Sequence, residues 1–318
     1  MAAQQMPLFP QRGVRGERTP LSAPAGALSA DSSLSAAIGG FHDYMLRRGF
    51  TENTIKSFLG DLRLLSRYLG PARRVGKIST KDLNDFLTYL LYYRGKPCKP
   101  KSYSRRITTL KVFFKWLAEE EEIIPKDPAA PLVHVHVTSP LPQILYDEQV
   151  ERLLEATGRL LQAEKPDPRP HLLVSLILAT GIKKSECMGI ALNDIDLSDR
   201  QAPVLYIRYT NPKMQHKERK LQLPPDFLPL LEQYLAVYKP KERLFECTAR
   251  NLEYVLRNVS EMAKLPHSAS FEMLRMTCAV RDYRAGMPLE RLRQKLGLSP
   301  ITWAEVSEKV KRLAAPPL

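Results

Sequence analysis

The sequence lacks several features that would assign it to a common class of protein. No apolar run approaches the roughly 18 residues of a bilayer-spanning helix, and the N-terminus has no secretory signal pattern. There is no Gly-x-Ser-x-Gly motif, glycine-rich phosphate loop or zinc-ligand cluster. We therefore expect a cytoplasmic protein that uses no metal, nucleotide or other cofactor and has no membrane partner.

Cysteine and histidine are scarce and show no ligand pattern. His134 and His136 form an H-V-H spacing that can bind a metal on a strand, but no nearby Cys or carboxylate completes a site. We favour an extended segment with two idle imidazoles. Idle or buried thiols in a reducing cytosol best explain the four scattered cysteines, which are Cys98, Cys187, Cys247 and Cys278.

Acidic residues are too few to balance the basic ones. The chain has 48 Lys and Arg against 34 Asp and Glu, a formal net charge of +14. Residues 31–120 alone hold 17 basic and 8 acidic residues. Such clustering favours a nucleic-acid partner over a charge that only maintains solubility.

Apolar residues recur at three- and four-residue steps in four stretches between residues 31 and 121, which predicts a compact four-helix domain. The stretches begin near Leu34, Thr51, Ser79 and Ser102, and Ser79 has the pattern of a helix N-cap. Basic and polar residues before and along the fourth helix form a flank that we expect to bind DNA. These residues are Lys96, Lys99, Lys101, Arg105, Thr108, Lys111 and Lys115.

The remaining segments differ in composition. Residues 1–30 are rich in Pro, Gly, Ala and Gln and predict a flexible basic tail. The prolines of residues 122–145 predict an extended linker. Residues 146–318 mix helical periodicity with strand-like runs at 203–209 and 217–223. The fold class is thus mainly α, in two domains, with one small antiparallel sheet.

Four stretches after residue 31 have the motifs and spacing of one known family. They are GFTENTIKSFLGDLRLLSRYL within 34–69, LILATGIKKSECMGIALNDIDL at 176–197, KERKLQLP at 217–224, and the block at 271–310 that begins FEMLRMTCAVRDYR. The first resembles the start of the core-binding domain of the tyrosine recombinase, or phage integrase, family. The others resemble its A-T-G-x-R-x-S-E box, its lysine hairpin, and the block with its last histidine and tyrosine. The resemblance implies a helical SAM-like core-binding domain followed by an α+β catalytic-type domain, acting on double-stranded DNA.

The resemblance also places the family's catalytic groups on this sequence. The two arginines that bind the scissile phosphate fall at Lys183 and Arg275, and the lysine that acts as general acid falls at Lys213. The two histidines fall at Glu272 and Leu298, and the tyrosine nucleophile falls at Ser307. Lys183 keeps a positive charge but loses the two-pronged contact of arginine, and a carboxylate at Glu272 would repel a phosphate. Arg275 is retained. The hairpin lysine is Lys213 or Lys217, and we favour Lys213.

Ser307 is the decisive substitution. An aliphatic hydroxyl is far more basic than a phenol, whose pKa is about 10, and serine is too short to reach the place of a phenol oxygen. Tyr283, the nearest upstream tyrosine, is out of register, and no tyrosine follows it. We therefore predict a DNA-binding protein without self-contained cleavage activity, in which Lys183, Lys213, Lys217 and Arg275 remain candidate phosphate contacts.

Alternatives remain open at this point. The protein is a functioning recombinase if it uses an unusual nucleophile or one from a partner subunit, and either a second copy or another recombinase is a candidate partner. It is an interaction module if it has lost DNA binding, although the charge of residues 31–120 argues against this. Glu186 either orients Lys183 or is a solvated helix residue. Arg275 either contacts phosphate or forms a buried ion pair with Glu272.

Overall fold

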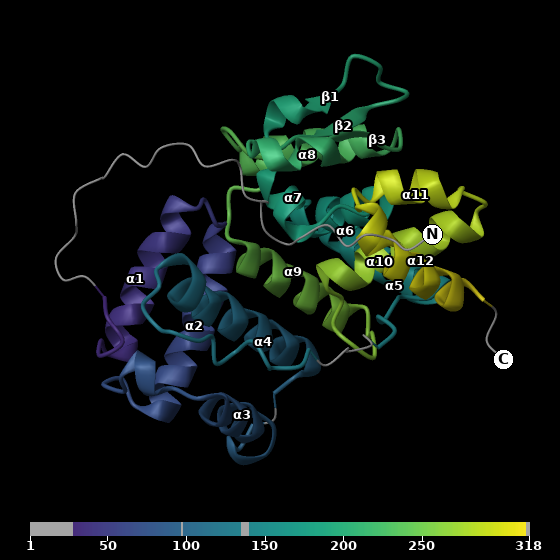
Figure 1. The fold of residues 1–318 in the computed structure, drawn as a ribbon. Coiled ribbons are helices and arrows are strands. Elements are labelled where there is room, and N and C mark those ends of the chain that lie inside the picture. Colours follow the sequence, from purple (N-terminus) through teal and green to yellow (C-terminus); the bar gives the residue numbers. More distant parts are fainter. Residues whose placement is uncertain (1–27, 97, 135–139, 316–318) are drawn as a thin grey trace. The chain divides into compact units, whose positions relative to one another are not determined.

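The computed structural model describes residues 28–96, 98–134 and 140–315, so most of the expected tail at 1–30 and His136 lie outside the described residues. The chain divides into two compact units, residues 1–139 and 140–318 (Figure 1). Among the described helices, none is both long and apolar enough for a membrane crossing.

The first unit contains the four expected helices; three of them start at a capping side chain, and α4 starts with Pro100 in its first turn. The side chains of Ser33, Thr51 and Ser79 accept hydrogen bonds from backbone N–H groups of the turn that follows each of them, and Ser79 forms a capping box with Asp82. Short π-helical turns at Tyr89–Tyr93 and Trp116–Glu120 extend the last two helices. The helices are α1 (Leu34–Arg47), α2 (Glu52–Leu69), α3 (Thr80–Thr88) and α4 (Pro100–Lys115).

Aromatic side chains from α1 and α4 form the centre of the first core. The rings of Phe41 and Phe113 meet edge to face with centroids 5.2 Å apart, and both side chains are fully buried. Apolar residues of the expected linker also pack here, since Ile124, Ala129 and Leu132 are buried in this cluster.

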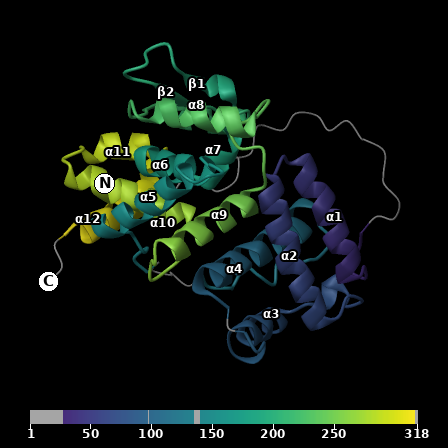
Figure 2. The same cartoon turned by 180° about the vertical axis from the view of Figure 1, so that it is seen from behind.

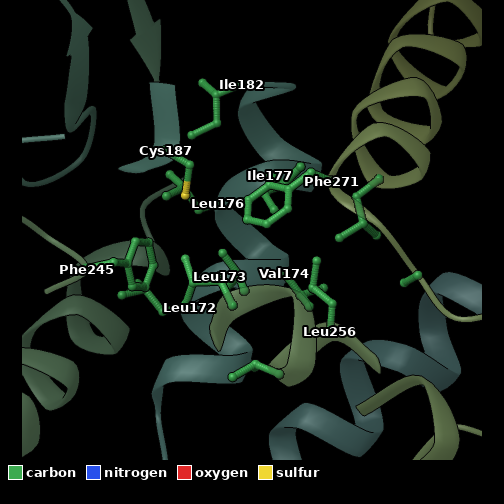
Figure 3. Close-up of a cluster of buried hydrophobic side chains, with 14 of the residues drawn as sticks. Leu172, Leu173, Val174, Leu176, Ile177, Ile182, Cys187, Phe245, Leu256 and Phe271 are labelled. Atoms are coloured by element: carbon green, nitrogen blue, oxygen red, sulfur yellow. The ribbon is translucent and has the colours of Figure 1, made fainter. Parts of the chain in front are cut away.

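The second unit is mainly helical around a central helix, α6. The side chains of α6 are apolar on nearly all sides, so the helix is covered all round (Figure 3). Helix α10 packs against α6 and also against α12 (Figure 2). The helices are α5 (Asp147–Leu161), α6 (Arg169–Thr180), α7 (Lys184–Gly189), α8 (Phe227–Tyr238), α9 (Ala249–Met262), α10 (Phe271–Arg284), α11 (Leu289–Lys295) and α12 (Pro300–Ala314).

A small antiparallel sheet completes this unit. The two predicted strands are confirmed as β2 (Val204–Ile207) and β3 (Arg219–Gln222), with Leu205 paired to Leu221. A third strand, β1 (Ile195–Asp196), pairs with β2 and was not expected, because two residues show no alternation. The fold class predicted from the sequence, mainly α with a small antiparallel sheet, is confirmed.

Candidate functional site

Two of the family's catalytic positions, Lys183 and Arg275, meet where α6 ends. Gly181 terminates α6 in the left-handed conformation, at φ +62°, as its position after Thr180 suggests. Glycine is required there for a second reason, since a Cβ would lie 2.8 Å from the Leu296 side chain. The chain then turns into α7, and β3 and the loop after α11 approach the same point, which we call the site junction.

A buried carboxylate lies at the centre of the site junction. Glu186 accepts two hydrogen bonds from the guanidinium of Arg219, at 2.9 and 3.2 Å, and others from the backbone N–H of Lys183 and the hydroxyl of Tyr209. Burial alone raises the pKa of Glu186, but the hydrogen bonds and charge of Arg219 prevail and lower it to about 2. Glu186 is therefore a buried ionic anchor and not a solvated helix residue.

Lys183 points into the same junction but is held by groups of its own chain. Its Nζ donates to the carbonyl of Gly297 at 3.0 Å and lies 3.5 Å from Oε1 of Glu186. Burial lowers the pKa of Lys183, and Glu186 opposes that effect. The interpretation that Glu186 orients Lys183 thus agrees with the geometry.

Arg275 is 4% exposed, and its guanidinium is directed at backbone oxygens. It donates to the carbonyl of Gly181 and, at 2.6 Å, to that of Leu296. Within the described part of the chain Arg275 forms no ion pair with Glu272, which is exposed and attracts the guanidinium only at longer range. Burial lowers its pKa. This arginine joins α10 to the ends of α6 and α11.

The nucleophile position is enclosed in a helix. Ser307 lies on α12, is 8% exposed, and donates its hydroxyl hydrogen to the carbonyl of Ala304 one turn earlier, at 3.2 Å. Leu298 is half-buried in the cluster beneath α12, and Glu272 is exposed on α10. The hydrogen bonds that hold the site junction together involve none of these three side chains.

The hairpin between β2 and β3 provides a residue that the sequence interpretation missed. Lys217 is half-buried, with its Nζ 3.6 Å from the sulfur of Met214, and the side chain of Lys213 lies outside the described residues. Arg219, two residues further on, carries the buried guanidinium. The alternation of the strand could have indicated that Arg219 points inward, because it shares a face of β3 with the buried Leu221.

Some residues of the basic flank expected along α4 are bound to groups of the chain itself, and the others are exposed. Arg105 forms an ion pair with the buried Asp61 at 2.8 Å, whereas Lys111 donates to the carbonyl of Ala130 at 3.0 Å. Thr108 donates to the carbonyl of Ser104 within its own helix, and Lys115 lies 3.5 Å from Glu119. The remaining members are exposed; they are Lys96, Lys99 and Lys101.

Arg105 lines an open pocket in the first unit with a volume of about 380 Å³. We call this pocket the basic hollow. Asp61 at its base is almost fully buried and pairs with Arg105 and Arg106. Burial raises the pKa of Asp61 although both arginines oppose that effect. The charged residues lining it are Lys56, Asp61, Arg67, Arg94, Arg105 and Arg106. Such an excess of cations is suited to anion binding, and phosphate accepts bidentate arginine contacts.

Comparison with known sequences agrees with this arrangement. The sequence model described as "Phage integrase family" matches residues 143–305, and that described as "Phage integrase, N-terminal SAM-like domain" matches residues 38–121. The chain is 29% identical over 264 residues to the tyrosine recombinase XerC of Staphylococcus haemolyticus, covering 79% of this chain and 84% of that protein. The XerC of Staphylococcus epidermidis is 28% identical over 268 residues, covering 80% and 86%.

Solved structures share the fold at low sequence identity. A XerH site-specific recombinase bound to its palindromic difH substrate superposes with a TM-score of 0.69 at 18% identity, covering 92% of this chain and 97% of that one. A lambda integrase dimer bound to a COC′ core site gives 0.68 at 16% identity, covering 91% and 81%. With one sequence model spanning the second unit and a second model spanning the helices of the first, the chain belongs to the phage integrase family.

Proposed function

We propose that this protein binds duplex DNA and does not cleave it by itself. The observation that carries the proposal is the state of Ser307. Its hydroxyl is buried in α12 and bonded within its own helix, and serine attack on a phosphate requires an adjacent general base.

The site junction supports the same conclusion. Stabilising the charge on a scissile phosphate requires donors that are free to bind its oxygens. Arg275 already donates to two carbonyls and Lys183 to a third. The bidentate face of Arg219 is occupied by Glu186. A phosphate would have to displace these internal partners, and it would then lie beside the buried carboxylate of Glu186.

DNA binding is supported by charge and by family likeness. The basic hollow presents five cations around one buried carboxylate, within a helical unit that matches the integrase SAM-like domain. The XerH and lambda integrase structures named above are complexes with DNA. Phosphate contacts from such cations give affinity through counterion release, largely independently of sequence.

Cleavage is tested with a duplex nicked near the candidate scissile phosphate, on which a covalent protein–DNA adduct accumulates if any nucleophile attacks. We expect binding by gel shift and no adduct on a denaturing gel. An adduct formed by the purified chain would refute the proposal. An adduct formed only after a second recombinase is added would instead support a partner-supplied nucleophile.

Binding is tested through its dependence on salt. For about six phosphate contacts, affinity falls by roughly 10³ between about 50 and 200 mM salt. Replacing Arg67 and Arg94 by Gln should reduce the slope of log K against log salt by about 2. A matched control, Lys77→Gln with Lys81→Gln, removes the same charge outside the hollow and should change the slope less. A flat salt response of the unaltered protein would contradict DNA binding by this surface.

A further inference from the structure

Two neighbouring tyrosines are the most exposed aromatic side chains among the described residues. Tyr92 is 74% exposed and Tyr93 75%, and their ring centroids lie 6.4 Å apart at an interplanar angle of 68°. Both stand at the end of the π-helical turn that extends α3. A single exposed aromatic residue is common on a protein surface, whereas an adjacent pair leaves a large apolar area in water and calls for an explanation.

The turn that carries them is closed at its base. The N–H of Cys98 donates to the carbonyl of Leu90 at 3.1 Å, and both residues are buried in the first core. The sulfur of Cys98 also accepts a hydrogen bond from Arg106. Gly95 allows the chain to reverse, since its φ of +76° is unfavourable for residues with a Cβ. The two rings therefore project from an anchored turn.

The same turn leads directly into the basic hollow. Arg94, next to Tyr93 in the chain, lines the hollow, and so does Arg106, which holds the base of the turn. Lys96 and Lys99, further along the chain, are exposed. The surface thus combines a cationic concavity with exposed aromatic rings, the two features with which proteins bind unpaired nucleotides: cations follow the backbone and rings stack on bases.

We propose that Tyr92 and Tyr93 stack on an unpaired base of DNA whose adjacent phosphate occupies the basic hollow. The preferred ligand is then DNA with unpaired nucleotides, such as a bulge or a gap, because bases inside a paired helix already stack on their neighbours. This inference rests on the proposed DNA binding and adds the class of DNA that is preferred. Stacking contributes about 5- to 150-fold in affinity per base.

The test compares affinities of the full chain for a duplex and for the same duplex with one unpaired adenine. We expect the bulged duplex to bind at least about 5-fold more tightly. Tyr92→Phe with Tyr93→Phe keeps the rings and should retain that ratio, whereas Tyr92→Leu with Tyr93→Leu should bring it towards one. Tyr146→Leu, which removes an exposed tyrosine of the second unit, is the matched control and should leave both affinities unchanged.

A fluorescent base separates stacking from other contacts. With 2-aminopurine at the unpaired position, binding should quench the emission for the original protein and the Phe variant, and not for the Leu variant. Loss of the preference in the Phe variant would overturn stacking in favour of hydroxyl contacts. Equal affinity of the original protein for both DNAs would overturn this inference and leave duplex binding intact. Binding to neither DNA at low salt would overturn the proposed function as well.

Discussion

Replacing Glu186 by Gln should destabilise the second unit more than any other single loss of charge at the site junction. The carboxylate accepts hydrogen bonds from Arg219, Tyr209 and the backbone of Lys183. A pKa lowered from 4.5 to about 2 corresponds to roughly 3 kcal/mol at neutral pH. Removing one partner of a buried ion pair typically costs about 3–5 kcal/mol, because the other charge is left buried without a partner.

The pH dependence follows from the sign of the shift. Because folding lowers the pKa of Glu186, its contribution is fully present above pH 4.5 and is lost as the pH falls towards 2. The Glu186→Gln variant lacks this group, so the difference in free energy of unfolding between the two proteins should shrink through that pH range. A constant difference would show that the destabilisation comes from packing and not from charge.

The measurement can be confined to the second unit. The chain has two tryptophans, Trp116 in the π-helical turn that follows α4 and Trp303 in α12. In a Trp116→Phe background, the fluorescence of Trp303 reports the second unit alone during urea unfolding. Glu290→Gln, which removes a carboxylate paired with Arg293 on the surface, is the matched control and should have little effect. A loss below about 1 kcal/mol for Glu186→Gln would refute the role of this carboxylate as an anchor.

Three further outcomes are expected from the same structure. Ser307→Tyr should not restore an adduct on the nicked duplex, because the phosphate-binding groups remain bound to their own chain, and inserting a phenol at a buried position should cost about 1–3 kcal/mol by urea unfolding. Gly297→Ala should lower the thermal stability of the protein more than Gly286→Ala does. Both glycines have a positive φ, which costs an alanine about 1–2 kcal/mol of backbone strain. Only at Gly297 would the added Cβ also lie 2.5 Å from the guanidinium of Arg219. The Cys278 thiol should react with a thiol reagent only as fast as the second unit opens, because burial raises its pKa to about 12.

Helix positions could be predicted from the sequence because they depend on local signals. The apolar spacing after Leu34 and Thr51 and the capping pattern at Ser79 act within a few residues. The length of α12, which runs from Pro300 to Ala314, does not follow from such local signals alone. Its apolar side is narrow. The helix packs against α10, and this tertiary contact, which cannot be seen in the sequence, stabilises its later turns.

The site positions were predictable only as far as family spacing places them. Lys183 and Arg275 do converge on the site junction, but which partner each takes depends on tertiary contacts. The acceptors for Arg275 are the carbonyls of Gly181 and Leu296, and a carbonyl has no sequence signature. Arg219 was missed because family spacing directed attention to the lysines before it, although its place opposite Glu186 makes it the main cation of the junction.

From the internal partners at the site junction we expect that no single substitution towards the family's residues gives cleavage. Lys183 and Arg275 bind carbonyls at Gly297 and Leu296, adjacent residues of one loop. Arg219 also packs against Gly297 and donates to the carbonyl of Lys295. The three cations therefore stabilise the loop whose position sets the start of α12, and freeing any one of them for a phosphate weakens the support of the helix that would carry a nucleophile. When catalytic groups act as a unit, removing one of them can reduce the rate about as much as removing all of them. In this structure the same cations stabilise the loop, so under the proposed function we expect cleavage to require new partners for Glu186 and for the loop together with a tyrosine at position 307.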